Sequence, residues 1–244
     1  MTDTQVAAEP RPLKAFTVLE TSEGTGGIVF ARHSVVARRE GAAQFGDGDF
    51  HGVTCTRTQW ADRYADADEV PISEMIDHGW HFECGSCGQR IDNDYLLERD
   101  WVSEDVIGSQ HSTVYCNAVC EARQALHRAE AAYHERRWIR RFRRLVKRRF
   151  PDAVLVKGEG LTAEAHAYAD KRQGRWAIQS VVVSFEFPGM QIAPATLRYS
   201  RKEPSRWDRA PFKYAKPEWS CCYGDKEAFE AYAATPRHLD KGEG

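Results

Sequence analysis

Hydrophobic and polar positions near the start of the chain follow the short period that is typical of strands. Three segments rich in apolar and β-branched residues predict strands, and they are Phe16–Leu19, Ile28–Ala31 and Val53–Arg57. Residues 34–44 predict a helix between the last two strands, with Ser34 as its N-cap. The order β-β-α-β indicates a small N-terminal ββαβ module over residues 13–70, after an expected disordered leader at residues 1–12.

A helical period governs the stretch from Cys116 to Arg149, which Pro151 should end. Its apolar residues fall on two faces that are rotated by roughly 140°. The first face has Ala118, Ala122, Leu126, Ala129 and Tyr133, and the second has Trp138, Ile139, Phe142, Leu145 and Val146. One straight helix with one buried face cannot hold both sets. The pattern therefore predicts either a break near residues 134–137 or two halves that pack on different modules.

The strand period returns in residues 151–244, which predict a β-rich C-terminal module. The expected strands are Ala153–Val156, Ala163–Ala169, Trp176–Phe187 and Thr196–Tyr199. A last short helix is expected over residues 225–234. The predicted fold class is α+β, with a C-terminal antiparallel β-sheet and a middle region over residues 71–150.

Four cysteines in two close pairs are the strongest chemical signal in this middle region, and they are Cys84, Cys87, Cys116 and Cys120. Glycines flank the first pair and allow a tight turn whose N–H groups point at thiolate sulfur. Four thiolates predict a closed, structural Zn²⁺ site with no open position for water. The alternatives are four unrelated buried cysteines, or His81 as a substitute ligand. The roles of Cys55, Cys221 and Cys222 stay open.

The knuckle at residues 84–88, followed by a pair that enters a helix at residues 115–120, resembles treble-clef zinc fingers over about 45 residues. This resemblance implies a zinc finger over residues 71–150 together with the long basic helix. Some treble-clef proteins are HNH nucleases, but the interval between the cysteine pairs holds only His111. The catalytic positions of that pattern are not matched, so we expect no enzyme. Separately, the pattern at residues 26–31 with its following Ala/Arg helix is similar to uncharacterised phage and prophage proteins.

Charge is distributed unevenly along the chain. Residues 1–115 carry 9 Lys/Arg against 20 Asp/Glu, whereas the remainder carries 25 against 16. Nine cationic residues crowd one end of the long helix with no acid among them, and they are Arg136, Arg137, Arg140, Arg141, Arg143, Arg144, Lys147, Arg148 and Arg149. The run predicts contact with phosphates of nucleic acid. The alternative is contact with the acidic half of the chain or with an acidic protein partner.

Aromatic residues interleave with cationic ones late in the chain and are candidates for stacking on bases, and they are Trp176, Tyr199, Trp207, Phe212, Tyr214 and Trp219. No apolar run is long enough to cross a bilayer, and residues 1–14 lack the apolar core of a signal peptide. We expect a cytoplasmic protein (in the host cytoplasm if it is phage-encoded) with no membrane partner. No motif for a small-molecule substrate is evident.

The expected function is a zinc-stabilised, non-enzymatic binding protein that contacts nucleic acid through its cationic helix. One alternative is a phage-type interaction or inhibitor module that binds a host protein. The other is an HNH-like nuclease.

Overall fold

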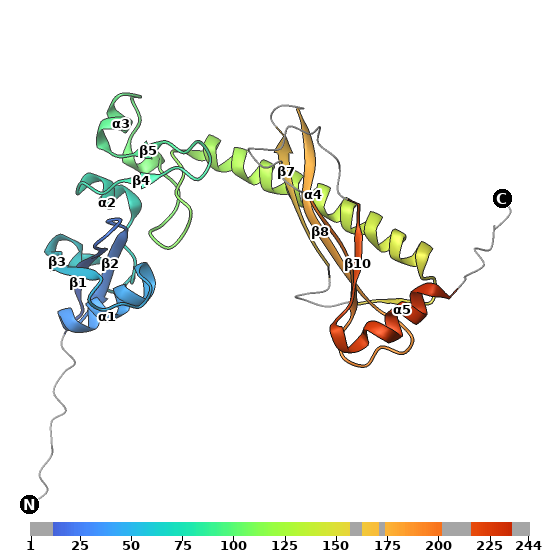
Figure 1. Ribbon diagram of the computed structural model, residues 1–244. Helices are drawn as coiled ribbons and strands as arrows, with labels where there is room; N and C mark the ends of the chain where they lie inside the picture. The colour runs from blue at the N-terminus through green and yellow to red at the C-terminus, as the bar shows by residue number, and fades with distance from the viewer. Residues whose placement is uncertain (1–11, 157–162, 171–173, 202–215, 236–244) are drawn as a thin grey trace, which may run out of the picture. The chain divides into compact units, whose positions relative to one another are not determined.

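The computed structural model describes residues 12–156, 163–170, 174–201 and 216–235 (Figure 1). The chain divides into two units, residues 1–125 and 126–244, and each mixes helices with antiparallel strands. The α+β class is therefore confirmed. The predicted leader lies outside the described residues except for Pro12, and the domain boundaries at residues 70 and 150 stay predictions.

The first unit begins with a three-stranded antiparallel sheet in the order β2-β1-β3, and its three strands lie where the sequence pattern predicts strands. Its strands are β1 (Lys14–Glu20), β2 (Gly26–Ala31) and β3 (Val53–Arg57). Helix α1 (Ser34–Phe45) covers one face of the sheet (Figure 1). Gly41 makes this close approach possible, because a Cβ there would lie 2.4 Å from Cγ1 of the buried Val18.

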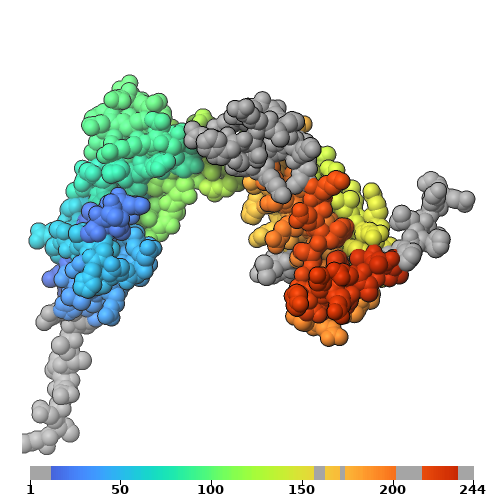
Figure 2. Space-filling view, viewed as in Figure 1, coloured from blue at the N-terminus to red at the C-terminus, as the bar shows by residue number. Residues whose placement is uncertain are grey.

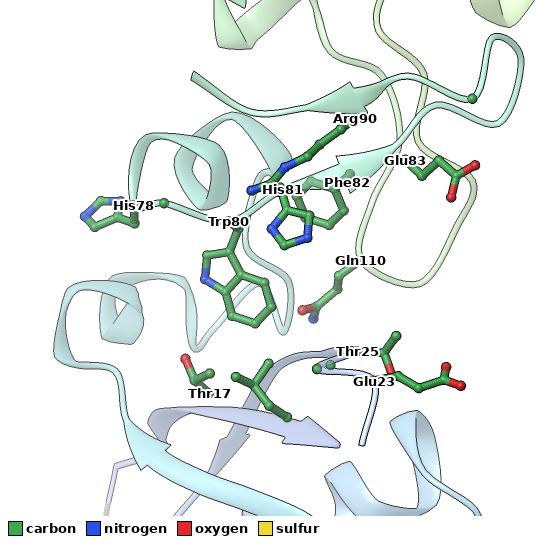
Figure 3. A pocket seen from close by; sticks show the side chains of 15 residues that line it. Thr17, Glu23, Thr25, His78, Trp80, His81, Phe82, Glu83, Arg90 and Gln110 are labelled. Atoms are coloured by element: carbon green, nitrogen blue, oxygen red, sulfur yellow. The ribbon is translucent and has the colours of Figure 1, made fainter. Parts of the chain in front are cut away.

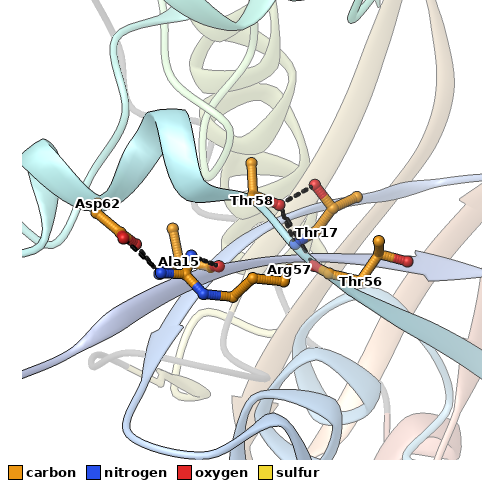
Figure 4. Close-up of polar contacts among 6 residues, drawn as sticks. All are labelled: Ala15, Thr17, Thr56, Arg57, Thr58 and Asp62. Carbon is orange, nitrogen blue, oxygen red and sulfur yellow. Dashed lines mark hydrogen bonds and ion pairs between the residues drawn. The ribbon is translucent and has the colours of Figure 1, made fainter.

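Side chains continue the β1–β3 ladder beyond the end of β3 (Figure 4). The Thr58 hydroxyl accepts the Thr17 N–H at 2.8 Å, and the Asp62 carboxylate accepts the Ala15 N–H at 2.8 Å. Arg57 pairs with Asp62 and holds the pKa of that carboxyl below its ordinary value. This network joins the sheet to η1 (Gln59–Tyr64), a 3₁₀ helix.

The other face of the sheet packs on a set of short elements, where Ile28 and Phe30 share a core with Met75 and Ile91. These elements are α2 (Ile72–Asp77), β4 (Phe82–Glu83), β5 (Arg90–Ile91), α3 (Asn93–Leu97) and η2 (Ser103–Asp105). The interval between the cysteine pairs has room for a hairpin, with residues 91–97 and 113–115 as its expected strands, but the first strand ends at Ile91. The Asp92 carboxylate accepts the Tyr95 N–H at 3.0 Å and thereby caps a helix instead.

Helix α4 (Ala118–Arg149) is continuous, so no break occurs near residues 134–137. Asn117 caps its start, because its side-chain oxygen accepts the Cys120 N–H at 3.1 Å. Cys120 belongs to the core of the first unit, whereas Phe142 belongs to the core of the second. The first predicted apolar face is largely exposed in the described structure: Leu126 is 61% exposed. Its alanine-rich composition offers little apolar area to bury.

The second unit contains an antiparallel sheet in the order β10-β9-β8-β6, with β7 also paired to β8. Its strands are β6 (Val154–Leu155), β7 (Ala163–Asp170), β8 (Arg175–Glu186), β9 (Ala195–Ser200) and β10 (Glu218–Ser220). The predicted alanine-rich strand β7 is confirmed, and β10 was not foreseen. Phe142 and Val146 of α4 share a core with Phe185 of the sheet. Helix α5 (Lys226–Ala234), in red in Figure 2, joins the same core through Phe229.

Candidate functional site

The two cysteine pairs meet in the first unit, where the four Sγ atoms all lie within 4.8 Å of one another. The Cys87 and Cys116 sulfurs are 3.6 Å apart. Tetrahedral Zn–S bonds of about 2.3 Å place sulfurs ~3.8 Å apart. Three of the cysteines are buried and Cys87 is exposed. This donor set can hold one metal ion.

Backbone hydrogen bonds explain why the first pair forms this turn. The Gly88 N–H donates to the Cys84 carbonyl at 2.9 Å, and Gly88 has a φ of +70°, which favours glycine. The Gly85 N–H donates to the Val114 carbonyl at 2.9 Å and so links the turn to the segment before Cys116. A Cβ at residue 85 would lie 2.1 Å from the Thr113 side chain, so this link also requires glycine.

The thiols differ in their tendency to ionise. Burial opposes ionisation of Cys84, but backbone N–H groups of Cys87, Cys116 and Ser86 outweigh it and lower the pKa of Cys84 to about 6. Burial and the neighbouring Cys84 and Cys87 raise the pKa of Cys116 to about 12. A second thiolate therefore forms at a cost unless a cation shares the charge, which is the chemistry a bound metal ion supplies.

His81, the alternative ligand, and the three remaining cysteines do not belong to this cluster. Among the described residues, the four cysteines are the only group of three or more His, Cys, Asp or Glu side chains close enough to share an ion. His81 lines a groove instead, and Cys55 donates to the Ser34 carbonyl at 3.4 Å. Cys222 donates to Asp225 in the second unit. His111, the candidate nuclease base, stacks on Phe45.

The nine predicted cationic contacts all lie on the second half of α4. Eight are exposed and Arg143 is half-buried. In the described part of the chain, none of the nine forms an ion pair with a carboxylate. The helix therefore presents a dense cationic surface that forms no carboxylate ion pair with the residues that the structure describes.

The structure separates these nine residues by their surroundings. Lys147 donates to the Pro151 and Ala153 carbonyls at 3.0 and 2.6 Å, and Arg149 donates to the Ala233 carbonyl at 2.9 Å. Lys147 therefore joins the end of α4 to the segment that follows it, and Arg149 joins α4 to α5. Four others line one cavity of about 660 Å³, and they are Arg137, Arg140, Arg141 and Arg144. We call it the arginine cavity.

Aromatic rings form the rest of the arginine cavity, which is completed by Tyr133, His134, Trp138 and Trp176. Trp176 belongs to β8, and its Nε1–H donates to the Glu130 carboxylate of α4 at 3.2 Å. His134 stacks on the indole with ring centroids 5.5 Å apart. Of the aromatics proposed to stack on bases, Trp176 is thus among the arginines, whereas Tyr199 is buried in the core.

The remaining stacking candidates have other positions. Trp219 lines a second cavity of about 520 Å³ with Arg148 and Arg149. Trp207, Phe212 and Tyr214 lie outside the described residues.

A third depression lies in the first unit, between the β4–β5 hairpin and the three-stranded sheet (Figure 3). Its volume is about 750 Å³, and Trp80 and Gln110 project into it. The Gln110 amide also bonds both the N–H and the carbonyl of Ile28, at 2.8 and 3.0 Å, and so occupies the edge of β2. Glu23 and Glu83 line this groove together with cationic Arg90, so it has no uniform charge.

Comparisons with models of protein families, with curated proteins and with solved structures find no match. The similarity of residues 26–31 to phage proteins therefore has no support from these comparisons. Within the described ranges, no helix combines the length and the hydropathy needed to span a membrane.

Proposed function

We propose that this protein is a zinc-stabilised, non-enzymatic nucleic-acid-binding protein. The observation that carries the proposal is the cationic half of α4, where eight of nine Lys and Arg residues are exposed and none of the nine is paired with a carboxylate among the described residues. Arginine forks match phosphate oxygens, and their high local density favours a polyanion as the ligand.

The metal in this proposal is Zn²⁺, and its role is structural. Four sulfur ligands suit zinc better than the oxygen-seeking Mg²⁺ or Ca²⁺, and a closed set leaves no position for a reacting water. A short hairpin that carries one cysteine pair, with the second pair at the start of a helix, matches the arrangement of a treble-clef finger. We infer that the zinc ion fixes the start of α4.

The experiment measures retention of a labelled oligonucleotide by the full-length protein at low salt. Arg140→Ala combined with Arg144→Ala removes two exposed charges from the arginine cavity. Arg39→Ala combined with Arg123→Ala removes the same charge at exposed positions outside the cationic run. We expect affinity to fall roughly tenfold or more in the first variant and little in the control.

Failure to bind DNA or RNA at low salt would overturn the proposal. That result would favour the alternative of a module that binds another protein, because the groove beside Trp80 is lined by aromatic rings and by charges of both signs. A divalent-metal-dependent cleavage of the oligonucleotide would instead support a nuclease.

A further inference from the structure

We propose that the arginine cavity binds an unpaired base of single-stranded nucleic acid, with the flanking phosphates held by its arginines. The inference rests on the proposed function and narrows it from nucleic acid in general to single strands. The inference depends on the four aromatic or imidazole rings that lie among the four arginines. A helix that binds only phosphates does not need such rings.

The arrangement of the rings supports stacking. Trp176 is held by its hydrogen bond to Glu130 and by His134, which lies nearly parallel to the indole at an interplanar angle of 17°. Tyr133 packs edge-on against His134 and is 51% exposed, so its ring is available to a ligand. A rigid aromatic wall with one accessible ring is suited to a planar base.

The charges around the aromatic rings of the arginine cavity are suited to single-stranded nucleic acid. Arg137, Arg140 and Arg144 are three or four residues apart and therefore follow one face of the helix along the cavity. Among the described residues that line the cavity there is no Asp or Glu. Phosphates on both sides of a stacked base can thus meet guanidinium groups, and the Glu130 carboxylate beside Trp176 already accepts the indole N–H.

A duplex fits this cavity poorly. Its bases are stacked inside the helix and expose only their edges, so its phosphates could reach the arginines while the rings contacted no base face. The volume of about 660 Å³ lies in the range of sites that enclose small planar ligands.

The experiment compares Tyr133→Ala with Tyr133→Phe in the full-length protein, because phenylalanine keeps the ring and removes only the hydroxyl. The probes are a twelve-nucleotide oligothymidylate, an abasic oligonucleotide of the same length, a duplex and free thymidine monophosphate. We expect Tyr133→Ala to lower the affinity for oligothymidylate roughly 5- to 150-fold and Tyr133→Phe to leave that affinity unchanged. Neither substitution should change the affinity for the abasic strand. Wild type should prefer oligothymidylate to the duplex.

Equal affinity for single strand and duplex, or an equal loss on the abasic strand, would overturn this inference and leave the proposed function standing. If thymidine monophosphate binds as tightly as the oligonucleotide, the inference is wrong and the ligand of the cavity is a free nucleotide. Binding of none of these probes would overturn the proposed function as well.

Discussion

The two units of this protein are stabilised in different ways. In the first, the elements around the cysteines are very short, since β4 and β5 have two residues each and α3 has five. Three of the four cysteines belong to its core, beside residues such as Ile91 and Leu96. In the second, long strands and α4 enclose a core of stacked aromatic rings around Phe150.

This difference suggests that the metal site and the proposed binding surface belong to different units. Elements as short as β4 and β5 bury little apolar area by themselves, so we expect a bound ion to stabilise the first unit. We expect no such dependence in the second unit, where an aromatic core packs beneath the exposed arginines of α4. Loss of metal should therefore change the two units very differently.

The largest expected effect is loss of the metal from the first unit. Structural zinc sites in finger peptides contribute about 10–16 kcal/mol, which is comparable with the whole stability of a domain. We expect one zinc per chain by elemental analysis, and none after Cys120→Ser. Without zinc the first unit should lose its cooperative unfolding transition, while that of the second unit remains.

Cys55→Ser is the matched control, because Cys55 lies outside the cluster. It should retain both the zinc and the transition. A first unit that unfolds at the same temperature with and without chelator would contradict the proposed role of the metal.

A smaller effect is expected from truncation of the aromatic core. Phe142 is 2% exposed on α4, so Phe142→Ala should lower the free energy of unfolding of the second unit by about 3–5 kcal/mol. Leu126→Ala, at an exposed position of the same helix, should cost less than about 1 kcal/mol. Urea unfolding measures both. Similar losses in the free energy of unfolding for the two variants would contradict the exposed position of Leu126.

The smallest effect concerns Asp225, which is buried at the start of α5. Its carboxylate accepts the N–H of Ala193, and also those of Gln191 and Ile192, and these bonds outweigh burial and lower its pKa to about 2. Because the folded pKa is below the ordinary 3.8, this stabilisation is full above about pH 4 and is lost as the pH falls toward 2.

We therefore expect Asp225→Asn to destabilise the second unit at pH 7, and the difference from wild type to shrink below pH 4. Unfolding midpoints in urea at several pH values measure this. Glu227→Gln, at an exposed position of the same helix, is the control. A difference that is independent of pH would exclude the ionised carboxylate as the cause.

The regular elements could be predicted from the sequence because their periods reflect burial on one face. The strands β1, β2 and β3 and the long β8 were foreseen in this way. The short elements between the cysteine pairs could not be, because the cysteine cluster and a single cap at Asp92 determine them more than periodicity does. The strand expected over residues 91–97 ends at Ile91 for this reason.

The candidate site was predictable in part. Spacing identified the four cysteines, and their proximity in the structure confirms that they can share a metal ion. The run of Arg and Lys residues was also visible, but tertiary contacts decide which of them bond neighbouring carbonyls and which line the cavity. Trp176 and Tyr133 lie 43 positions apart in the chain, and only the packing of β8 against α4 brings them to one cavity.

The salt dependence of nucleic-acid affinity tests the central claim most directly. For single strands, the plot of log binding constant against log salt concentration has a negative slope, and each lost phosphate contact makes that slope shallower by about 0.7. Arg140→Ala combined with Arg144→Ala should therefore reduce the steepness of the slope by about 1.4, and the Arg39 and Arg123 control pair should leave it unchanged. Equal slopes for wild type and both variants would contradict a phosphate-binding role for α4.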